Sequence, residues 1–411
     1  MTLSVMEQSA PTDDHEALIG LPTLMKMVYS GSDLTPLGVR LLNRAETHPD
    51  DANTLLDLSI ILQFKQNRDL AMTMQAEALK QQQIYNLHPV TERTSVRLLV
   101  ITGPGDLMAN TPFEFLVEGA DISVNTLYVG PSLPIPSSLP DHDVVFVAIG
   151  ESEENRRSLI QLMDVMKSWP VPVLNMPDRI ALLSRDDACL LLKGAPGIVM
   201  PATVRTSRQP LERIGRGEVS MKAMFQDMDF PIILRPVDSH AGRELDRIDT
   251  AEALAEYLSK SPENEFFIAP FMDYRSGDGQ FRKYRIILID GRPYVCHMAI
   301  SDHWMIHYLN AGMEQSPEKR AEEARFMASF DDDFALRHQA AFQAITERTG
   351  LDYLGIDCGE TPDGKLLIFE IDSNMIVHDM DPVDIFPYKQ PQMQKLFGAF
   401  RSMLEKAANL S

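Results

Sequence analysis

The spacing of acidic residues near the C-terminal end of the chain indicates that carboxylates face one another across two strands. Two strand-like stretches, 353–359 and 365–372, flank Asp363-Gly364, a pair typical of a two-residue type I′ turn. Counting back from such a turn, Asp357 lies directly opposite Glu370. Like charges placed opposite each other destabilise a sheet unless a cation lies between them.

A third carboxylate belongs to the same face. Asp372 lies two residues beyond Glu370, and side chains alternate along a strand. Oxygen ligands on rigid strands suit Mg²⁺ bridged to phosphates. We therefore predict a Mg²⁺ site, with Mn²⁺ as the alternative ion, formed by Asp357, Glu370, Asp372 and Asn374. A solvated acidic strand face is the competing interpretation.

Cations are placed on a second predicted hairpin, over 281–300. Asp290-Gly291 is again a candidate two-residue turn, and Lys283 and Arg285 share one face of the first strand. Two neighbouring cations suit an anion. The alternative is a charged outer face paired with local carboxylates.

Arg235 ends the apolar strand that begins at Pro231, where a charge is costly unless it is paired. The loop that follows contains Ser239 and Gly242, and its amides suit phosphate oxygens. A short glycine loop alone is a weak signal, but beside Arg235 it indicates a phosphate site.

The stretch 302–312 has no helical or strand periodicity and contains His303, His307 and Asn310. We expect these three residues to bind substrate. Zinc would need the two histidines on one helix, and no H-E-x-x-H motif is present. Plain core packing is the other alternative.

Composition narrows the function classes. The chain has 411 residues, with 38 Lys and Arg against 59 Asp and Glu, a net charge of −21. So acidic a surface repels nucleic acid and anionic membranes, so we expect neither as a partner. Three separated cysteines argue against disulfides, and no signal peptide or membrane-spanning stretch is evident. We expect a cytoplasmic protein.

The elements that must position these residues fall into segments. Residues 1–94 are expected to be helical, and a helix–turn–helix of about 34 residues there resembles a tetratricopeptide unit. That segment is either a helical cap or a site for a protein partner. Over 95–175, apolar strands alternate with helices, which predicts a small parallel α/β domain. Its Gly103-Pro-Gly turn is not a dinucleotide-binding fingerprint.

Taken in order, the segments resemble the ATP-grasp ligase superfamily over roughly residues 95–405, in the style of glutathione-synthetase-like and ribosomal-protein-modifying glutamate ligases. The motifs that carry the resemblance are Asn175-Met-Pro-Asp, Arg185-Asp-Asp, Phe230-Pro-Ile-Ile-Leu-Arg235-Pro, Ser239-His-Ala-Gly-Arg, Phe267-Ile-Ala-Pro-Phe-Met-Asp273, Tyr284-Arg285 and Glu370-Ile-Asp372-Ser-Asn374. The resemblance implies mixed α/β and α+β architecture. The α/β domain precedes a two-lobed ATP-grasp domain, with a nucleotide-binding subdomain over 176–260 and a metal-binding subdomain over 261–411.

The resemblance also implies roles for residues. Nucleotide contacts would come from Arg185, Arg235, Ser239, His240, Gly242, Phe271 and Asp273, with Asp273 on the ribose. Catalysis would rest on Arg285, Arg235 and Lys283. Two lysines of the family are absent here: Arg235 stands at one position, and the other falls near Arg185 or Asp187. Arginine can hold phosphates bidentately and so replace a lysine.

The implied function is an ATP-dependent ligase that joins a carboxylate to an amine or thiol through an acyl phosphate, on small-molecule or peptide substrates. Two alternatives stay open: a phosphotransferase of the same fold, and a non-catalytic nucleotide-binding scaffold. A homo-oligomer is compatible with the sequence.

Overall fold

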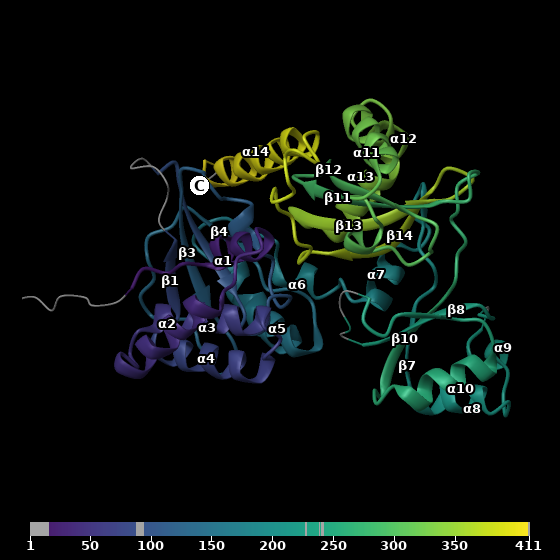
Figure 1. The fold of residues 1–411 in the computed structure, drawn as a ribbon, viewed down its shortest axis with the longest axis horizontal. Coiled ribbons are helices and arrows are strands. Elements are labelled where there is room, and N and C mark those ends of the chain that lie inside the picture. Colours follow the sequence, from purple (N-terminus) through teal and green to yellow (C-terminus); the bar gives the residue numbers. More distant parts are fainter. Residues whose placement is uncertain (1–15, 88–93, 227, 238, 240–241, 410–411) are drawn as a thin grey trace, which may run out of the picture. The chain divides into compact units, whose positions relative to one another are not determined.

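The computed structural model describes residues 16–87, 94–226, 228–237, 239 and 242–409. The chain divides into two compact units, Met1–Leu87 and His88–Ser411. Helices and several sheets are mixed along it, so the predicted α/β and α+β class is confirmed (Figure 1). No helix in the described part of the chain is long and apolar enough to cross a membrane.

The first unit is helical and ends in a short strand. Its elements are α1 Leu21–Tyr29, α2 Thr35–Thr47, α3 Ala52–Phe64, α4 Arg68–Gln81 and β1 Ile84–Leu87. Asp51 caps α3 by accepting a hydrogen bond from the Thr54 amide. Leu24, Leu41 and Ile61 belong to its buried core. The predicted helical hairpin is therefore present, and its relation to tetratricopeptide repeats stays a prediction.

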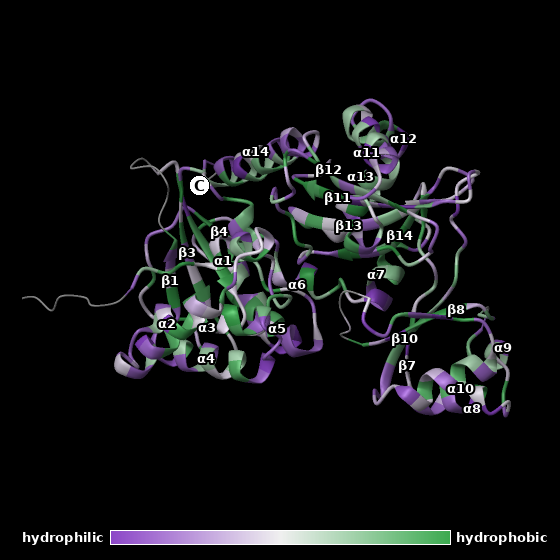
Figure 2. Cartoon of the chain, viewed as in Figure 1, coloured by the Kyte–Doolittle hydropathy of each residue, from purple (hydrophilic) through white to green (hydrophobic). Residues whose placement is uncertain are grey.

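The second unit begins with a parallel sheet in which β3, β2, β4 and β5 follow one another. The strands are β2 Val96–Thr102, β3 Ile122–Tyr128, β4 Val144–Val147 and β5 Val173–Leu174, and Figure 2 shows the sheet as mostly hydrophobic. The helix α5 Glu153–Lys167 follows β4, with Ser152 as its N-cap. The connection between β2 and β3 has no α-helix, only a 3₁₀ turn, η1 Phe113–Phe115.

A second sheet is antiparallel, in the order β7-β10-β8-β9, and α8 and α10 pack beside it (Figure 1). Its strands are β7 Val204–Ser207, β8 Ile232–Pro236, β9 Asp246–Ile248 and β10 Glu265–Pro270. The helices are α8 Arg208–Gly215, α9 Met221–Met224 and α10 Ala251–Lys260. Leu211, Leu234 and Leu254 join the elements in one buried core.

The third sheet has the order β12-β11-β13-β14-β6. Its strands are β6 Ile198–Val199, β11 Phe281–Ile289, β12 Arg292–Ser301, β13 Tyr353–Glu360 and β14 Leu366–Asp372. The remaining helices are α6 Pro177–Ile180, α7 Arg185–Leu192, η2 Tyr308–Asn310, α11 Pro317–Ser329, α12 Phe334–Arg337, α13 Gln339–Thr349 and α14 Lys389–Ala408. This sheet carries most of the predicted chemistry.

Candidate functional site

The predicted pairing of Asp357 with Glu370 is confirmed, although the predicted turn is wrong. The β13–β14 loop has three residues, closed by Thr361 and Lys365, and among them only Gly364 has a positive φ, of 77°. A type I′ turn needs positive φ at two central residues. The three-residue loop shifts the register by one, and a bulge beyond Asp357 shifts it back.

The β11–β12 turn is the two-residue turn that the sequence predicts. Asp290 and Gly291 have φ values of 48° and 75°, and Ile289 pairs with Arg292. Here too a bulge follows Arg285. Bulges are frequent beside active sites because they re-aim side chains.

Asp357 is buried between the two predicted cations. Arg285 donates from Nε to Oδ1 at 2.8 Å and from Nη2 to Oδ2 at 2.9 Å, and Lys283 Nζ lies 2.6 Å from Oδ2. Burial alone would raise the pKa of Asp357, but Arg285 and Lys283 hold it well below its usual range. The carboxylate is therefore charged and fully occupied by protein cations.

Glu370 is neutralised from a distant part of the sequence. The Arg185 guanidinium hydrogen-bonds Glu370 Oε1, and it also donates to the Phe369 carbonyl at 3.4 Å. Burial raises the pKa of Glu370, but Arg185 and Arg235 lower it overall. Asp372, on the same face, has a pKa raised to about 7 by burial and by the charge of Glu370.

The predicted metal site is only partly assembled. Among the described residues, no group of three or more His, Cys, Asp or Glu side chains has metal-binding geometry. Asp357 is committed to Lys283 and Arg285, and Asn374 is committed elsewhere: its Nδ2 donates to the Met108 carbonyl at 3.0 Å and its Oδ1 contacts Ser373 Oγ at 3.1 Å. Four ligands around one ion are thus not observed. Glu370 and Asp372 still fit a divalent cation, because the two half-buried carboxylates lie on one face of the strand and the charge of Glu370 raises the pKa of Asp372.

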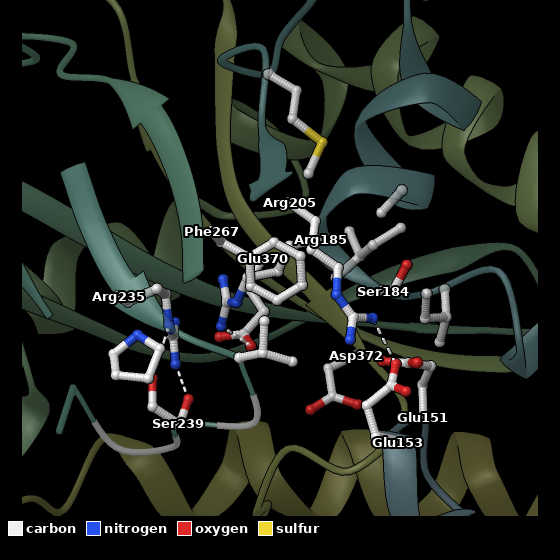
Figure 3. Close-up of a pocket in the computed structure, with 16 residues that line it drawn as sticks. Glu151, Glu153, Ser184, Arg185, Arg205, Arg235, Ser239, Phe267, Glu370 and Asp372 are labelled. Atoms are coloured by element: carbon white, nitrogen blue, oxygen red, sulfur yellow. Dashed lines mark hydrogen bonds and ion pairs between the residues drawn. The ribbon is translucent and has the colours of Figure 1, made fainter. Parts of the chain in front are cut away.

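A pocket of about 650 Å³, open solvent at its mouth included, lies beside Glu370 and Asp372 (Figure 3). Its polar lining residues are Glu151, Glu153, Ser184, Arg185, Arg205, Arg235, Ser239, Glu370 and Asp372. Five of these, Arg185, Arg235, Ser239, Glu370 and Asp372, are predicted site residues that the fold brings together from α7, β8, the following loop and β14. Phe267 of β10 supplies an aromatic wall.

Arg235 is the unusual member of the pocket. Its side chain is buried, and its hydrogen bonds go to Ser239: Nε donates to Oγ at 3.1 Å and Nη2 bonds the carbonyl. In the described ranges no carboxylate forms an ion pair with it. Burial and the nearby Arg185 lower the pKa of Arg235 to about 9. Glu370 acts on Arg235 only from beyond ion-pair distance, and a buried cation without an ion pair is costly, so an anionic ligand would stabilise this arrangement.

Several predicted nucleotide residues lie outside the pocket lining. His240 is outside the described residues. Asp273 pairs with Arg275 at 2.5 Å, and Phe271 packs its edge on Trp304 with the Arg247 guanidinium 4.3 Å above its ring. Their roles at the adenosine stay predictions.

The predicted substrate residues lie in the loop between β12 and α11. His303 and Asn310 are exposed, and the Asn310 Oδ1 accepts from the His307 amide at 2.9 Å. The two histidines are not on a helix, so the zinc alternative loses its geometry. Gly242 has a φ of 71°, and a Cβ there would lie 2.8 Å from His307 Nε2, so the loop after β8 meets this segment.

Sequence reasoning missed several pocket residues. Glu151 follows β4 at the carboxyl end of a parallel strand, a position from which a site residue could have been predicted. Arg205 had no sequence signal: it bonds Glu153 at 2.6 Å and Glu265, linking α5 to β10. His297, opposite Arg285, was also missed.

Comparisons with known proteins give structural neighbours only. No family model and no curated protein matches the chain. Among solved structures, the chain is similar to the D-alanine–D-alanine ligase from Bacillus anthracis complexed with ATP, at 13% identity and a TM-score of 0.46 over 77% of this chain and 99% of that one. It is also similar to the RimK domain protein ATP-grasp from Sphaerobacter thermophilus, at 15% identity and a TM-score of 0.43 over 75% and 99% of the two chains. A third neighbour is the VanG D-Ala:D-Ser ligase from Enterococcus faecalis, at 14% identity and a TM-score of 0.45 over 76% of this chain and 100% of that one. With TM-scores below 0.5, the function proposed next rests on the contacts of this chain.

Proposed function

We propose that the chain is an ATP-grasp ligase, which uses ATP to activate a carboxylate as an acyl phosphate and then joins it to an amine or thiol. The observation that carries this proposal is Arg235, a buried guanidinium that hydrogen-bonds Ser239 and has Arg185 beside it. Two arginines on one pocket wall, with a carboxylate pair beside them, suit a polyphosphate and its counter-ion.

Each group then has a task. Arg185, Arg235 and Ser239 bind the phosphates, and Phe267 offers an apolar wall to the base. Glu370 and Asp372 would hold Mg²⁺, which when bound neutralises phosphate charge. Lys283 and Arg285, oriented by their bonds to Asp357, hold the transferring phosphoryl group and the carboxylate that receives it.

The reaction has two halves. A substrate carboxylate oxygen attacks the γ-phosphorus of ATP, the bond to the β-phosphate oxygen breaks, and ADP leaves with that electron pair. The nucleophile then attacks the acyl carbon, and inorganic phosphate leaves. Loop residues 237 and 239 line the pocket and Gly242 meets His307, in the right place to limit access of water to the acyl phosphate.

The test is to incubate the protein with Mg-ATP and a panel of amino acids and cell-extract metabolites, and to follow ADP. We expect ADP formation that depends on an acid and an amine together. ADP formation with one co-substrate and a stable phosphorylated product would favour the phosphotransferase. Binding of Mg-ATP without turnover on any panel would favour the scaffold.

A further inference from the structure

A histidine that the proposed function does not use ends a row of side chains across the third sheet. His297 on β12 pairs with Arg285, Arg285 with Asp357, and Asp357 with Glu370. Directly paired residues of antiparallel strands share one face. The four side chains therefore form a continuous row, with pocket residue Glu370 at one end and His297 at the other.

The ring of His297 is available to a ligand. It is half-buried and packs against the ring of Tyr308, with centroids 4.7 Å apart, yet within the described parts of the chain its nitrogens make no hydrogen bond. His142 is different: its Nδ1 lies 2.8 Å from the Pro140 carbonyl and its Nε2 accepts from Trp169 at 3.0 Å. A half-buried imidazole whose nitrogens have no hydrogen-bond partner among the described residues is free to take up a proton.

The surroundings of His297 keep it neutral. Burial, then the positive charges of Arg285 and Lys389, lower its pKa well below the ordinary value; Asp357 opposes this and Lys283 adds to it. At pH 7 one ring nitrogen therefore carries a free lone pair. The imidazole stands next to the guanidinium assigned to the transferring phosphoryl group.

We propose that His297 takes the proton of the amine nucleophile in the second half of the reaction; this rests on the proposed ligase function. The amine nitrogen attacks the acyl carbon and a C–N bond forms. The C–O bond to phosphate breaks, and inorganic phosphate leaves with the electron pair. The proton released by nitrogen moves to a ring nitrogen of His297 and then to solvent.

The test separates the two halves of the reaction with hydroxylamine, which is mostly unprotonated at pH 7 and attacks acyl phosphates without a base. The full chain is incubated with Mg-ATP and, as acids, the twenty standard amino acids, D-alanine and a small-molecule extract. Hydroxamate reports the acyl phosphate, and ADP released on addition of an amine panel reports complete ligation. The variants are His297→Gln, which keeps hydrogen bonding but accepts no proton, and His48→Gln, a matched change in the helical unit.

We expect His297→Gln to form hydroxamate within about twofold of wild type and to lose ligation roughly 100-fold at pH 7, a usual contribution of a general base. The loss should shrink as pH rises, because hydroxide can then accept the proton of the attacking nitrogen in place of the ring, and His48→Gln should behave as wild type. An equal fall of hydroxamate and ligation, a loss that does not change with pH, or no loss would each overturn the role of His297. If wild type forms no hydroxamate from any acid, the ligase function itself is wrong and this role falls with it.

Discussion

Replacing Arg235 with methionine separates a binding arginine from a structural one. Methionine keeps the length and apolar bulk of the side chain but removes the charge. If the arginine stabilises the fold, its replacement lowers the stability of the ligand-free protein. If it serves an anionic ligand, its replacement weakens only the binding of that ligand. Arg282 offers a control, since it is half-buried and bonds Asp278 at 2.7 Å and Glu322 at 2.6 Å.

The magnitude follows from the surroundings of Arg235. Its pKa falls from the ordinary guanidinium value to about 9, mainly through burial and then through Arg185. At 1.36 kcal/mol per pKa unit, keeping the guanidinium charged costs on the order of 5 kcal/mol as an upper limit. Loss of the two bonds to Ser239 offsets about 2 kcal/mol of that, at roughly 1 kcal/mol each. The ligand-free Arg235→Met protein should thus be at least as stable as wild type, whereas Arg282→Met should be less stable by about 1–2 kcal/mol because two partly exposed carboxylates lose their partner.

Although Arg235→Met should not lower stability, it should weaken the binding of Mg-ATP. A charge-assisted hydrogen bond to phosphate contributes about 1.5–3 kcal/mol, so Arg235→Met should bind Mg-ATP at least tenfold more weakly. Thermal unfolding with and without Mg-ATP measures both effects, since ligand at a hundredfold excess over Kd stabilises by ~2.7 kcal/mol. The reasoning is refuted if Arg235→Met is clearly destabilised without ligand and keeps the full Mg-ATP shift. Arg282→Met should keep that shift.

Three further predictions concern other parts of the chain. Glu370→Gln should abolish metal-dependent ADP formation and lower stability by about 1–3 kcal/mol, since Arg185 loses its charged partner; wild-type ADP formation would contradict the metal assignment. Asp57, whose pKa is raised to about 6 mainly by burial, binds its proton more tightly in the folded than in the unfolded state, so its contribution to stability is lost as pH rises from about 4 to 6. The unfolding free energy of wild type minus that of Asp57→Asn should fall by on the order of 3 kcal/mol between pH 4 and pH 7. A difference that does not change with pH would refute the raised pKa of Asp57. Gly150→Ala should destabilise by about 1–3 kcal/mol because a Cβ would lie 1.4 Å from a neighbouring side-chain atom, while Gly398→Ala, in a helix with open space around it, should stabilise by about 0.5–1 kcal/mol; equal melting temperatures would contradict both.

Local patterns predicted the strands and their faces well. The alternation over β13 and β14 put Glu370 and Asp372 on one face, and Asp290-Gly291 forms the two-residue turn that its sequence indicates. The pairing of Asp357 with Glu370 came out right because two unpredicted features, a longer loop and a bulge, cancel. Bulges have no dependable sequence signature, and this limits any register argument.

An unpredicted bulge also decides which residue lies opposite Arg285. Counting from the Asp290-Gly291 turn puts Cys296 opposite Arg285, but the bulge after Arg285 moves His297 into that position. A one-residue slip exchanges the side chains on the two faces of a strand. The turn was therefore predicted correctly, but the residue at the end of the charged row was not.

The partners of the carboxylates were the other feature beyond reach of the sequence. The like-charge argument correctly required a cation beside Asp357 and Glu370, and a metal ion was the only candidate that a local pattern offered. The fold supplies protein cations instead: Lys283 and Arg285 arrive from the neighbouring strand, and Arg185 arrives from a helix 185 residues earlier in the chain. The sequence of one strand shows that a carboxylate needs a positive partner. Which cation becomes that partner depends on how whole helices and strands pack together. Arg235 shows the same distinction: its strand indicated that it needs an anion, and in the described fold Glu370 acts on it without forming an ion pair.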